Sequence, residues 1–169
     1  MRRISAMLLG IILGGQPAIA ADDPRPELLR LLDGHWTMTG DVMGKPVLYD
    51  LKAGPVLANT FTELHMKDVA PRPEYEARVF IGQDGEGQGI IAHWLDSFGA
   101  RYSIPHGRGR IVGDSISFIV PYKKTPFRDT FSYDRVKKTW RLVIESRQED
   151  GSWKHFARYL IQPAVKSLP

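Results

Sequence analysis

The chain has 169 residues, a net charge of +4 at pH 7 and no cysteine. Without cysteine it cannot be a disulfide scaffold, a thiol enzyme, an iron–sulfur protein or a lipoprotein anchored through a cleavage-site cysteine. The small positive charge, part of which lies in Arg2 and Arg3, is not the field of a polyanion-binding protein, so we expect no nucleic-acid partner.

The first element along the chain has the order of an export signal. An arginine pair at positions 2 and 3 precedes an apolar run at 6–13, and small residues precede a candidate cleavage site at Ala21. This apolar run is much shorter than the roughly 20 residues that a membrane span needs. We therefore expect a signal peptide at 1–20, a periplasmic mature protein, and no transmembrane segment in that mature chain.

The segment after the signal predicts one short helix. Its four leucines, in "ELLRLL", form an apolar stripe, Pro26 suits a first helical turn, and Gly34 ends the helical pattern. We expect a flexible N-terminus at 21–25, a single domain at 26–163 and a C-terminal tail at 164–169.

The rest of the domain consists of short alternating or apolar runs separated by glycine, proline and aspartate, which is typical of β-strands joined by turns. So many antiparallel strands pack as a sandwich or close into a barrel, because an open sheet would leave exposed edges. The runs predict strands at 35–42, 46–53, 56–67, 74–82, 88–96, 100–106, 109–112, 115–121, 127–134, 138–147 and 152–162.

Two motifs add a family resemblance to this pattern. Gly34-His35-Trp36, at the start of the first strand, resembles the G-x-W signature of lipocalins and the wider calycin superfamily. The hairpin "HWLDSFGARYSIPHG" is similar to the W-x-D-S-x-G hairpin of a lipocalin-like bacterial family of unassigned function, and with the last hairpin the resemblance spans 27–163. The expected fold class is thus all-β, a closed or nearly closed antiparallel calycin-like barrel of about 8–10 strands with one short N-terminal helix.

The resemblance also implies how one end of the barrel is sealed. In lipocalins the tryptophan of the signature closes the barrel, and an arginine of the last strand lies across its face. The matching residues here are Gly34, Trp36 and Arg158. By alternation, His35 faces away from Trp36 and is expected to be solvated.

The last predicted strand can be compared with the ligand-binding residues of two better-understood calycins. Fatty-acid-binding proteins hold a carboxylate with an Arg-x-Tyr pair, but Arg158 and Tyr159 are adjacent and point to opposite faces, so that clamp is absent. Nitrobindin holds haem through a histidine near its C-terminus, and His155 is the residue that could play that part. Haem at His155 is an alternative; the main expectation is no cofactor.

Aromatic side chains spread over several strands give the candidate ligand site. A barrel of this size either leaves room for one small ligand or is filled by its own side chains. A buried arginine among them would need an acid or a ligand to satisfy it. The expected partner is a small hydrophobic or amphipathic molecule, bound without catalysis by Tyr75, Trp94, Asp96, Arg101, Tyr102 and Phe118.

Catalytic and metal-binding alternatives have less support. The five histidines lack metal-ligand spacing, so we expect no metal. Asp96 and a histidine of the cavity could serve as acid and base, which is the enzyme alternative, but His93 and Asp96 are three residues apart on one strand and face opposite sides. The competing interpretation is that Asp96 and Ser97 cap a turn that Gly99 closes. The sequence leaves the oligomeric state open.

Overall fold

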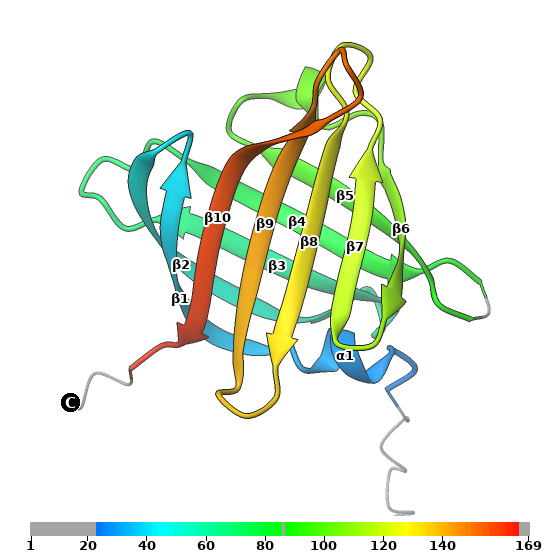
Figure 1. Ribbon diagram of the computed structural model, residues 1–169. Helices are drawn as coiled ribbons and strands as arrows, with labels where there is room; N and C mark the ends of the chain where they lie inside the picture. Colours follow the sequence, from blue (N-terminus) through cyan, green and yellow to red (C-terminus); the bar gives the residue numbers. More distant parts are fainter. Residues whose placement is uncertain (1–22, 86, 166–169) are drawn as a thin grey trace, which may run out of the picture.

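A computed structural model describes residues 23–85 and 87–165, so the predicted signal peptide at 1–20 lies outside the described residues. In these two ranges one short helix precedes ten strands, and a single 3₁₀ turn, η1, lies between the fifth and sixth strands (Figure 1). The elements are α1 (Glu27–Arg30), β1 (Gly34–Val42), β2 (Lys45–Val56), β3 (Phe61–Asp68), β4 (Glu76–Gln83), β5 (Gly89–Asp96), η1 (Ala100–Tyr102), β6 (Gly107–Val112), β7 (Ser115–Val120), β8 (Phe127–Asp134), β9 (Thr139–Arg147) and β10 (Trp153–Pro163).

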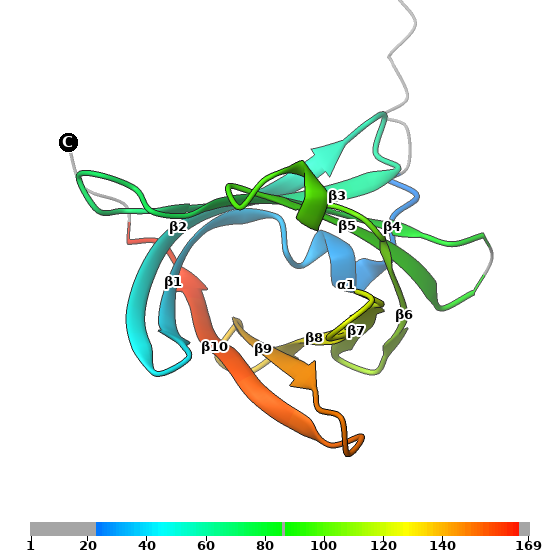
Figure 2. The ribbon, with the colours of Figure 1, turned by 90° about the horizontal axis from the view of Figure 1, so that it is seen from above.

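The ten strands form one closed antiparallel barrel. Each strand pairs with the next along the chain, and β10 returns to pair with β1 from Trp36↔Pro163 to Val42↔Ala157. The end-on view shows the strands as a ring, with α1 inside its outline (Figure 2). Closure leaves no strand edge exposed, and the predicted all-β barrel with one short helix is confirmed.

One predicted strand is wrong. Residues 100–106 do not pair in the barrel: they contain η1 and a cis peptide bond between Ile104 and Pro105, and β6 begins only at Gly107. Proline has no N–H to donate to a sheet ladder, which is a physical reason for the strand to start after it. The strand predicted from residue 56 also begins later, at Phe61, because residues 57–59 have positive φ and form a turn.

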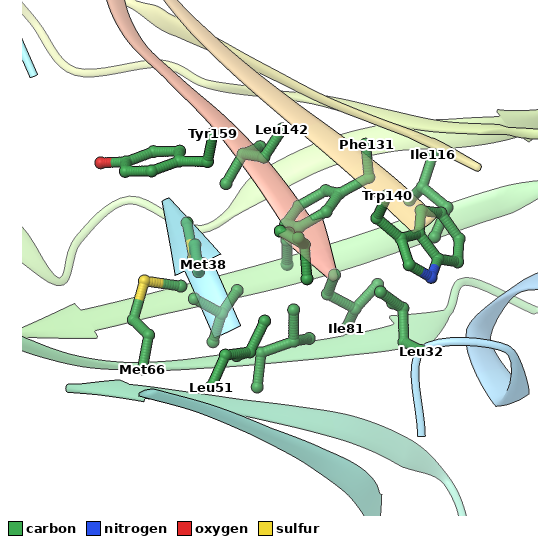
Figure 3. Close-up of a cluster of buried hydrophobic side chains, with 14 of the residues drawn as sticks. Leu32, Met38, Leu51, Met66, Ile81, Ile116, Phe131, Trp140, Leu142 and Tyr159 are labelled. Atoms are coloured by element: carbon green, nitrogen blue, oxygen red, sulfur yellow. The ribbon is translucent and has the colours of Figure 1, made fainter. Parts of the chain in front are cut away.

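Alternation along the strands fills the barrel with apolar side chains. On β9, for example, Trp140, Leu142 and Ile144 are buried, while Arg141 between them is exposed. Figure 3 shows this interior, from Leu32 and Trp140 near the helix to Tyr159 farther along the barrel. Because successive strand residues point to opposite faces, this pattern fixes which residues reach the interior.

The helix end of the barrel is sealed by packing and by hydrogen bonds to the helix. Leu28, Leu29 and Leu32 are buried against the strand interior. The indole Nε1 of Trp36 donates to the carbonyl of Leu32 at 2.7 Å, and that of Trp140 donates to the carbonyl of Leu31 at 3.3 Å. Two strands are thereby joined to the same helical segment, and both indole N–H groups are satisfied inside the core.

A buried arginine completes this end. Arg25 is 4% exposed and forms ion pairs at 2.6 Å with both Asp23 and Asp33. It also donates to the hydroxyl of Thr62 on β3 at 2.8 Å. The hydrogen bonds that Arg25 donates to Asp33 and Asp23 hold the pKa of Arg25 above its ordinary value. Arg25, in the segment 21–25 that the sequence predicts to be flexible, thus bonds to three side chains.

The arginine predicted to lie over Trp36 is elsewhere. Arg158 is exposed and pairs in register with Asp41, far along β1 from Trp36, which pairs with Pro163. Its neighbours on β10, Ala157 and Tyr159, are both buried, so alternation turns Arg158 outward. The predicted contact of Arg158 with Trp36 is wrong, whereas Gly34 does lie against Trp36: a Cβ at Gly34 would be 3.3 Å from its Nε1.

No helix in the described ranges is long and apolar enough to cross a membrane.

Candidate functional site

The end of the barrel opposite α1, here called the mouth, is formed by the turns and links at 43–44, 69–75, 97–106, 121–126 and 148–152 (Figure 1). Three tyrosines from different parts of the chain meet just inside it. The ring of Tyr49 on β2 lies 5.6 Å from that of Tyr75 and 5.9 Å from that of Tyr159 on β10. The ring of Phe98, which is largely exposed, continues this contact outward at 5.6 Å from Tyr75.

Asp96, at the end of β5, joins the tyrosine cluster through hydrogen bonds. Its Oδ1 accepts from the backbone N–H of Phe98 at 3.0 Å, which is the turn cap expected from the sequence. Its Oδ2 accepts from the hydroxyl of Tyr75 at 3.5 Å, and that hydroxyl accepts in turn from the indole Nε1 of Trp94 at 3.1 Å. Burial raises the pKa of Asp96, and burial followed by the charge of Asp96 raises the pKa of Tyr75.

A second carboxyl group, Asp129 on β8, lies deeper in the barrel. It is 3% exposed, and in the strand ladder it stands between Phe118 on β7 and Ile144 on β9, both buried. Its Oδ1 is buried and has no hydrogen-bond partner, the one such side-chain atom among the described residues. Burial alone raises the pKa of Asp129 to about 8.

Asp129 belongs to the same region as the tyrosines. Burial, the charge of Tyr49 and then the charge of Asp129 raise the pKa of Tyr159. Burial, the charge of Asp96 and then that of Asp129 raise the pKa of Tyr122, which lies in the link after β7. Asp129 is thus close enough to interact electrostatically with two phenols, although neither donates a hydrogen bond to its Oδ1.

No buried cation offsets Asp129. In the described part of the chain, the buried polar or charged side chains are Arg25, Thr62 and Asp129. Arg25 and Thr62 bond to each other at the helix end, while Asp129 lies toward the mouth. Buried carboxylates are normally paired or hydrogen-bonded, so this unpaired group needs a physical explanation.

The structure brings some of the predicted ligand-binding residues together and separates others. Tyr75, Trp94 and Asp96 form one hydrogen-bonded group, and Phe118 is buried beside Asp129. Arg101 and Tyr102 lie instead on the exposed η1, where the guanidinium carbon is 4.8 Å from the ring centroid. Ligand contact by any of these residues stays a prediction.

Asp129, Tyr49 and Tyr159 are not among the site residues predicted from the sequence. A signal for Asp129 was present in "FRDTFSYD", because alternation places it on the same face as Phe127 and Phe131. A carboxyl group on an apolar face is the kind of inconsistency that marks a functional or strained position. Tyr159 was identified only as a departure from the fatty-acid clamp, and its inward orientation follows from the same alternation.

The histidines lie outside this group. His93 is exposed, so it does not share a face with Asp96. The Nε2 of His155 hydrogen-bonds Asp41 at 2.8 Å on the outer wall, so His155 does not fit a haem held inside the barrel. Among the described residues, no group of three or more histidine, aspartate or glutamate side chains could hold a metal ion.

A surface hollow of about 750 Å³ also lies at the mouth, between the links at 121–126 and 148–152. Its lining is mostly polar and includes none of the aromatic residues described above: Lys124, Thr125, Arg147, Gln148, Glu149 and Asp150. This hollow therefore lacks the apolar lining that suits a hydrophobic ligand.

Comparison with known proteins supports the fold. No family model and no curated protein matches the sequence. A solved structure that is similar is the crystal structure of Rv2717c from M. tuberculosis, with a TM-score of 0.55 and 10% sequence identity over 83% of this chain and 99% of that chain. At this identity the likeness shows the fold alone, a β-barrel like the one described above.

Proposed function

We propose that this protein binds a small amphipathic molecule in the mouth of its barrel. The apolar part of the ligand contacts the rings of Tyr49, Tyr75 and Tyr159, and its polar part reaches Asp129. The observation that carries the proposal is the buried Oδ1 of Asp129, which has no partner in the free protein. A ligand group that bonds to this atom removes a cost that the empty barrel bears.

The surrounding rings give the proposal its apolar half. Tyr49 and Tyr159 are each 5% exposed. Together with Tyr75 they bring rings from three different segments of the chain into contact. Aromatic walls with a few polar groups at fixed positions are typical of small-molecule sites in barrels. Catalysis is not part of the proposal: His93 is exposed on β5, and His155 bonds to Asp41 on the outer wall.

Titration with the neutral dye Nile red, followed by fluorescence, tests the binding site. We expect saturable binding, and we expect Tyr49→Leu to weaken it by about fivefold, the size of one aromatic contact. Tyr133→Leu is the matched control, because Tyr133 stacks on Trp140 at the helix end with ring centroids 4.8 Å apart. No saturable binding, or an equal loss in both variants, would overturn the proposal.

We also propose export to the periplasm, which the arginine pair, the apolar run at 6–13 and the small residues before Ala21 support. Fractionation of the native host, with mass spectrometry of the recovered chain, tests it. The expected result is a periplasmic protein that begins at Ala21. Mass spectrometry of small molecules extracted from the same sample gives candidate ligands.

A further inference from the structure

We infer that the polar group of the ligand is a protonated amine, which pairs with Asp129 while the tyrosine rings surround it. This inference rests on the proposed function and narrows it to one ligand class: an amphipathic organic cation. It follows from three properties of the mouth, namely the unpaired carboxyl group, the absence of a buried base near it, and the aromatic rings.

The first property is the missing counterion. Among the described residues the other buried charge is Arg25, which faces two carboxylates and a hydroxyl. Within that same part of the chain, Asp129 has no hydrogen-bond partner at Oδ1 and no buried basic side chain near it. Buried charges in proteins are normally paired, and a buried charge that has lost its partner destabilises the folded state. An ammonium group supplies the missing positive charge and up to three N–H donors in one ligand atom.

The second property excludes the opposite charge. Asp96 and Asp129 are both in this region, and each raises the pKa of Tyr122, after burial, through its negative charge. Above the pKa of Asp129 a carboxylate or phosphate ligand would meet this negative potential, and the one buried arginine among the described residues, Arg25, lies at the opposite end of the barrel. The mouth is therefore unsuited to fatty acids, in agreement with the missing Arg-x-Tyr clamp.

The third property is the arrangement of rings. Tyr49 contacts Tyr75 and Tyr159 in tilted geometry, with centroids 5.6 and 5.9 Å apart, so the cluster offers both ring faces and hydroxyls. The negative face of an aromatic ring attracts a cation, and this attraction grows where water is excluded. A carboxylate beside several aromatic rings is thus matched to an ammonium that carries an apolar body.

The protonation of Asp129 gives the inference a signed pH dependence. The neighbours of Asp129 in the strand ladder, Phe118 and Ile144, do not titrate. The nearby phenols have raised pKa values, which keeps them neutral below pH 9: Tyr49, Tyr75, Tyr122 and Tyr159. Among the other acids that act on these phenols, Asp96 has a raised pKa, whereas hydrogen bonds lower the pKa values of Asp41 and Asp68, which stay ionised over this range. Arg128 and Glu145 pair with each other on the outer wall. Since a bound ammonium requires the carboxylate, amine affinity rises with pH up to about 8, the pKa of Asp129, and then levels off.

A neutral carboxyl group that donates to a carbonyl or hydroxyl of the ligand gives the reverse trend. Affinity for such a ligand is greatest below pH 8 and falls above it, because the proton that makes the hydrogen bond is lost. The direction of the pH dependence therefore separates the two chemistries without knowledge of the native ligand.

Three probes with one carbon skeleton test the inference: 3-phenylpropylamine, 3-phenylpropan-1-ol and 3-phenylpropanoate, titrated by calorimetry into the full mature chain at pH 6 and pH 8. We expect the amine to bind at least tenfold more tightly than the alcohol at pH 8, with the carboxylate weakest. Amine affinity should also be at least tenfold higher at pH 8 than at pH 6, while that of the alcohol changes little.

Two variants identify the group responsible. Asp129→Asn should abolish the preference for the amine and its pH dependence while alcohol binding persists, and Asp129→Leu gives a second test if the amide perturbs the fold. Asp50→Asn, on the outer wall of β2 beside Lys52, is the matched control and should keep the preference. If the alcohol binds as tightly as the amine, or if amine affinity falls as the pH rises, the amine inference is overturned while the proposed ligand binding stands. If none of the probes binds to the folded chain, the proposed function is overturned with it.

Discussion

The two ends of this barrel differ in whether their buried polar groups have hydrogen-bond partners. At the helix end, the guanidinium of Arg25 bonds to Asp23, Asp33 and Thr62. The indole N–H groups of Trp36 and Trp140 donate to the carbonyls of Leu32 and Leu31, just after α1. At the mouth, Asp129 is buried to a similar degree, yet its Oδ1 has no partner.

This contrast indicates that different requirements shape the two ends. A buried polar group left unpaired costs about 1–3 kcal/mol, so the helix end is arranged for stability in a way that the mouth is not. Unpaired and perturbed carboxyl groups concentrate at functional sites, where stability is lower than the fold would allow. The proposed function gives Asp129 its partner in the form of a ligand.

The largest expected effect tests the helix end. Trp140 is 0% exposed and donates to the carbonyl of Leu31 while it packs on Tyr133. We expect Trp140→Ala to lower the free energy of unfolding by about 3–5 kcal/mol, because it leaves a large cavity and an unpaired carbonyl. Urea denaturation at pH 7 measures the loss.

Trp153→Ala is the control for this prediction. Trp153 lies half-buried on the outer wall, where the guanidinium carbons of Arg128 and Arg147 are 4.5 and 5.4 Å from its ring. Its removal should cost only about 1 kcal/mol, the value of exposed cation–π contacts. Similar losses for the two tryptophans would mean that the helix end is not the more tightly packed region.

The next effect tests the mouth through pH. Folded Asp129 has a pKa of about 8, far above the ordinary value of 3.8, so between these values the folded chain holds a proton that the unfolded chain has lost. Stability therefore falls as the pH rises from about 4 to about 8, by about 1.4 kcal/mol per pH unit from this group, and levels off above.

Asp129→Asn removes that dependence. Relative to wild type, we expect the variant to gain roughly 3 kcal/mol of unfolding free energy between pH 5.5 and 7.5, because an amide cannot ionise. Thermal and urea unfolding of both proteins across this range measure the difference. Parallel pH profiles would show that Asp129 has found a partner in solution, and the contrast between the two ends would disappear.

The sequence predicts the barrel well because the fold depends on alternation and turn chemistry, which are local. The β9 segment from Trp140 to Ile144 shows one face buried and the other exposed, as the alternation predicts. The wrong strand at 100–106 has alternating polarity too, but its first residues form η1 and Pro105 has no N–H to donate to a ladder. Local polarity does not reveal whether a segment finds a pairing partner.

The site is less predictable because it depends on which side chains meet across the barrel. Tyr75, Trp94 and Asp96 were selected for their residue types, and their contact joins a loop to a strand that lies 19 and 21 positions away in the sequence. Arg158 was placed by a family resemblance, and its actual partner in the ladder, Asp41, follows from the register of β1 with β10. Register is a property of the closed barrel and not of either segment alone.

A smaller effect tests the charge pairing at the helix end. Arg25→Met keeps the length of the side chain and removes its charge, which leaves Asp33 and Asp23 without a counterion and Thr62 without its donor. We expect a loss of about 2 kcal/mol at pH 7, less than for a fully buried pair, since both carboxylates retain contact with water. Arg30→Met, on the exposed side of α1, is the control and should leave stability within about 0.5 kcal/mol of wild type. An unchanged unfolding midpoint for Arg25→Met would show that packing alone seals this end.

The smallest effect concerns the link between Trp94, Tyr75 and Asp96. Trp94→Phe keeps an aromatic ring but removes the indole N–H that donates to the hydroxyl of Tyr75. We expect a loss of only about 1 kcal/mol in unfolding free energy, the value of one hydrogen bond between half-buried groups. The hydroxyl of Tyr75 then keeps Asp96 as its one hydrogen-bond partner in this group of three residues. Nile red affinity should therefore change more in Trp94→Phe than in the control Trp153→Phe, which lies on the outer wall. If the two variants bind the dye equally well, the Tyr75 group stabilises the mouth without lining the ligand site, and the site narrows to Tyr49, Tyr159 and Asp129.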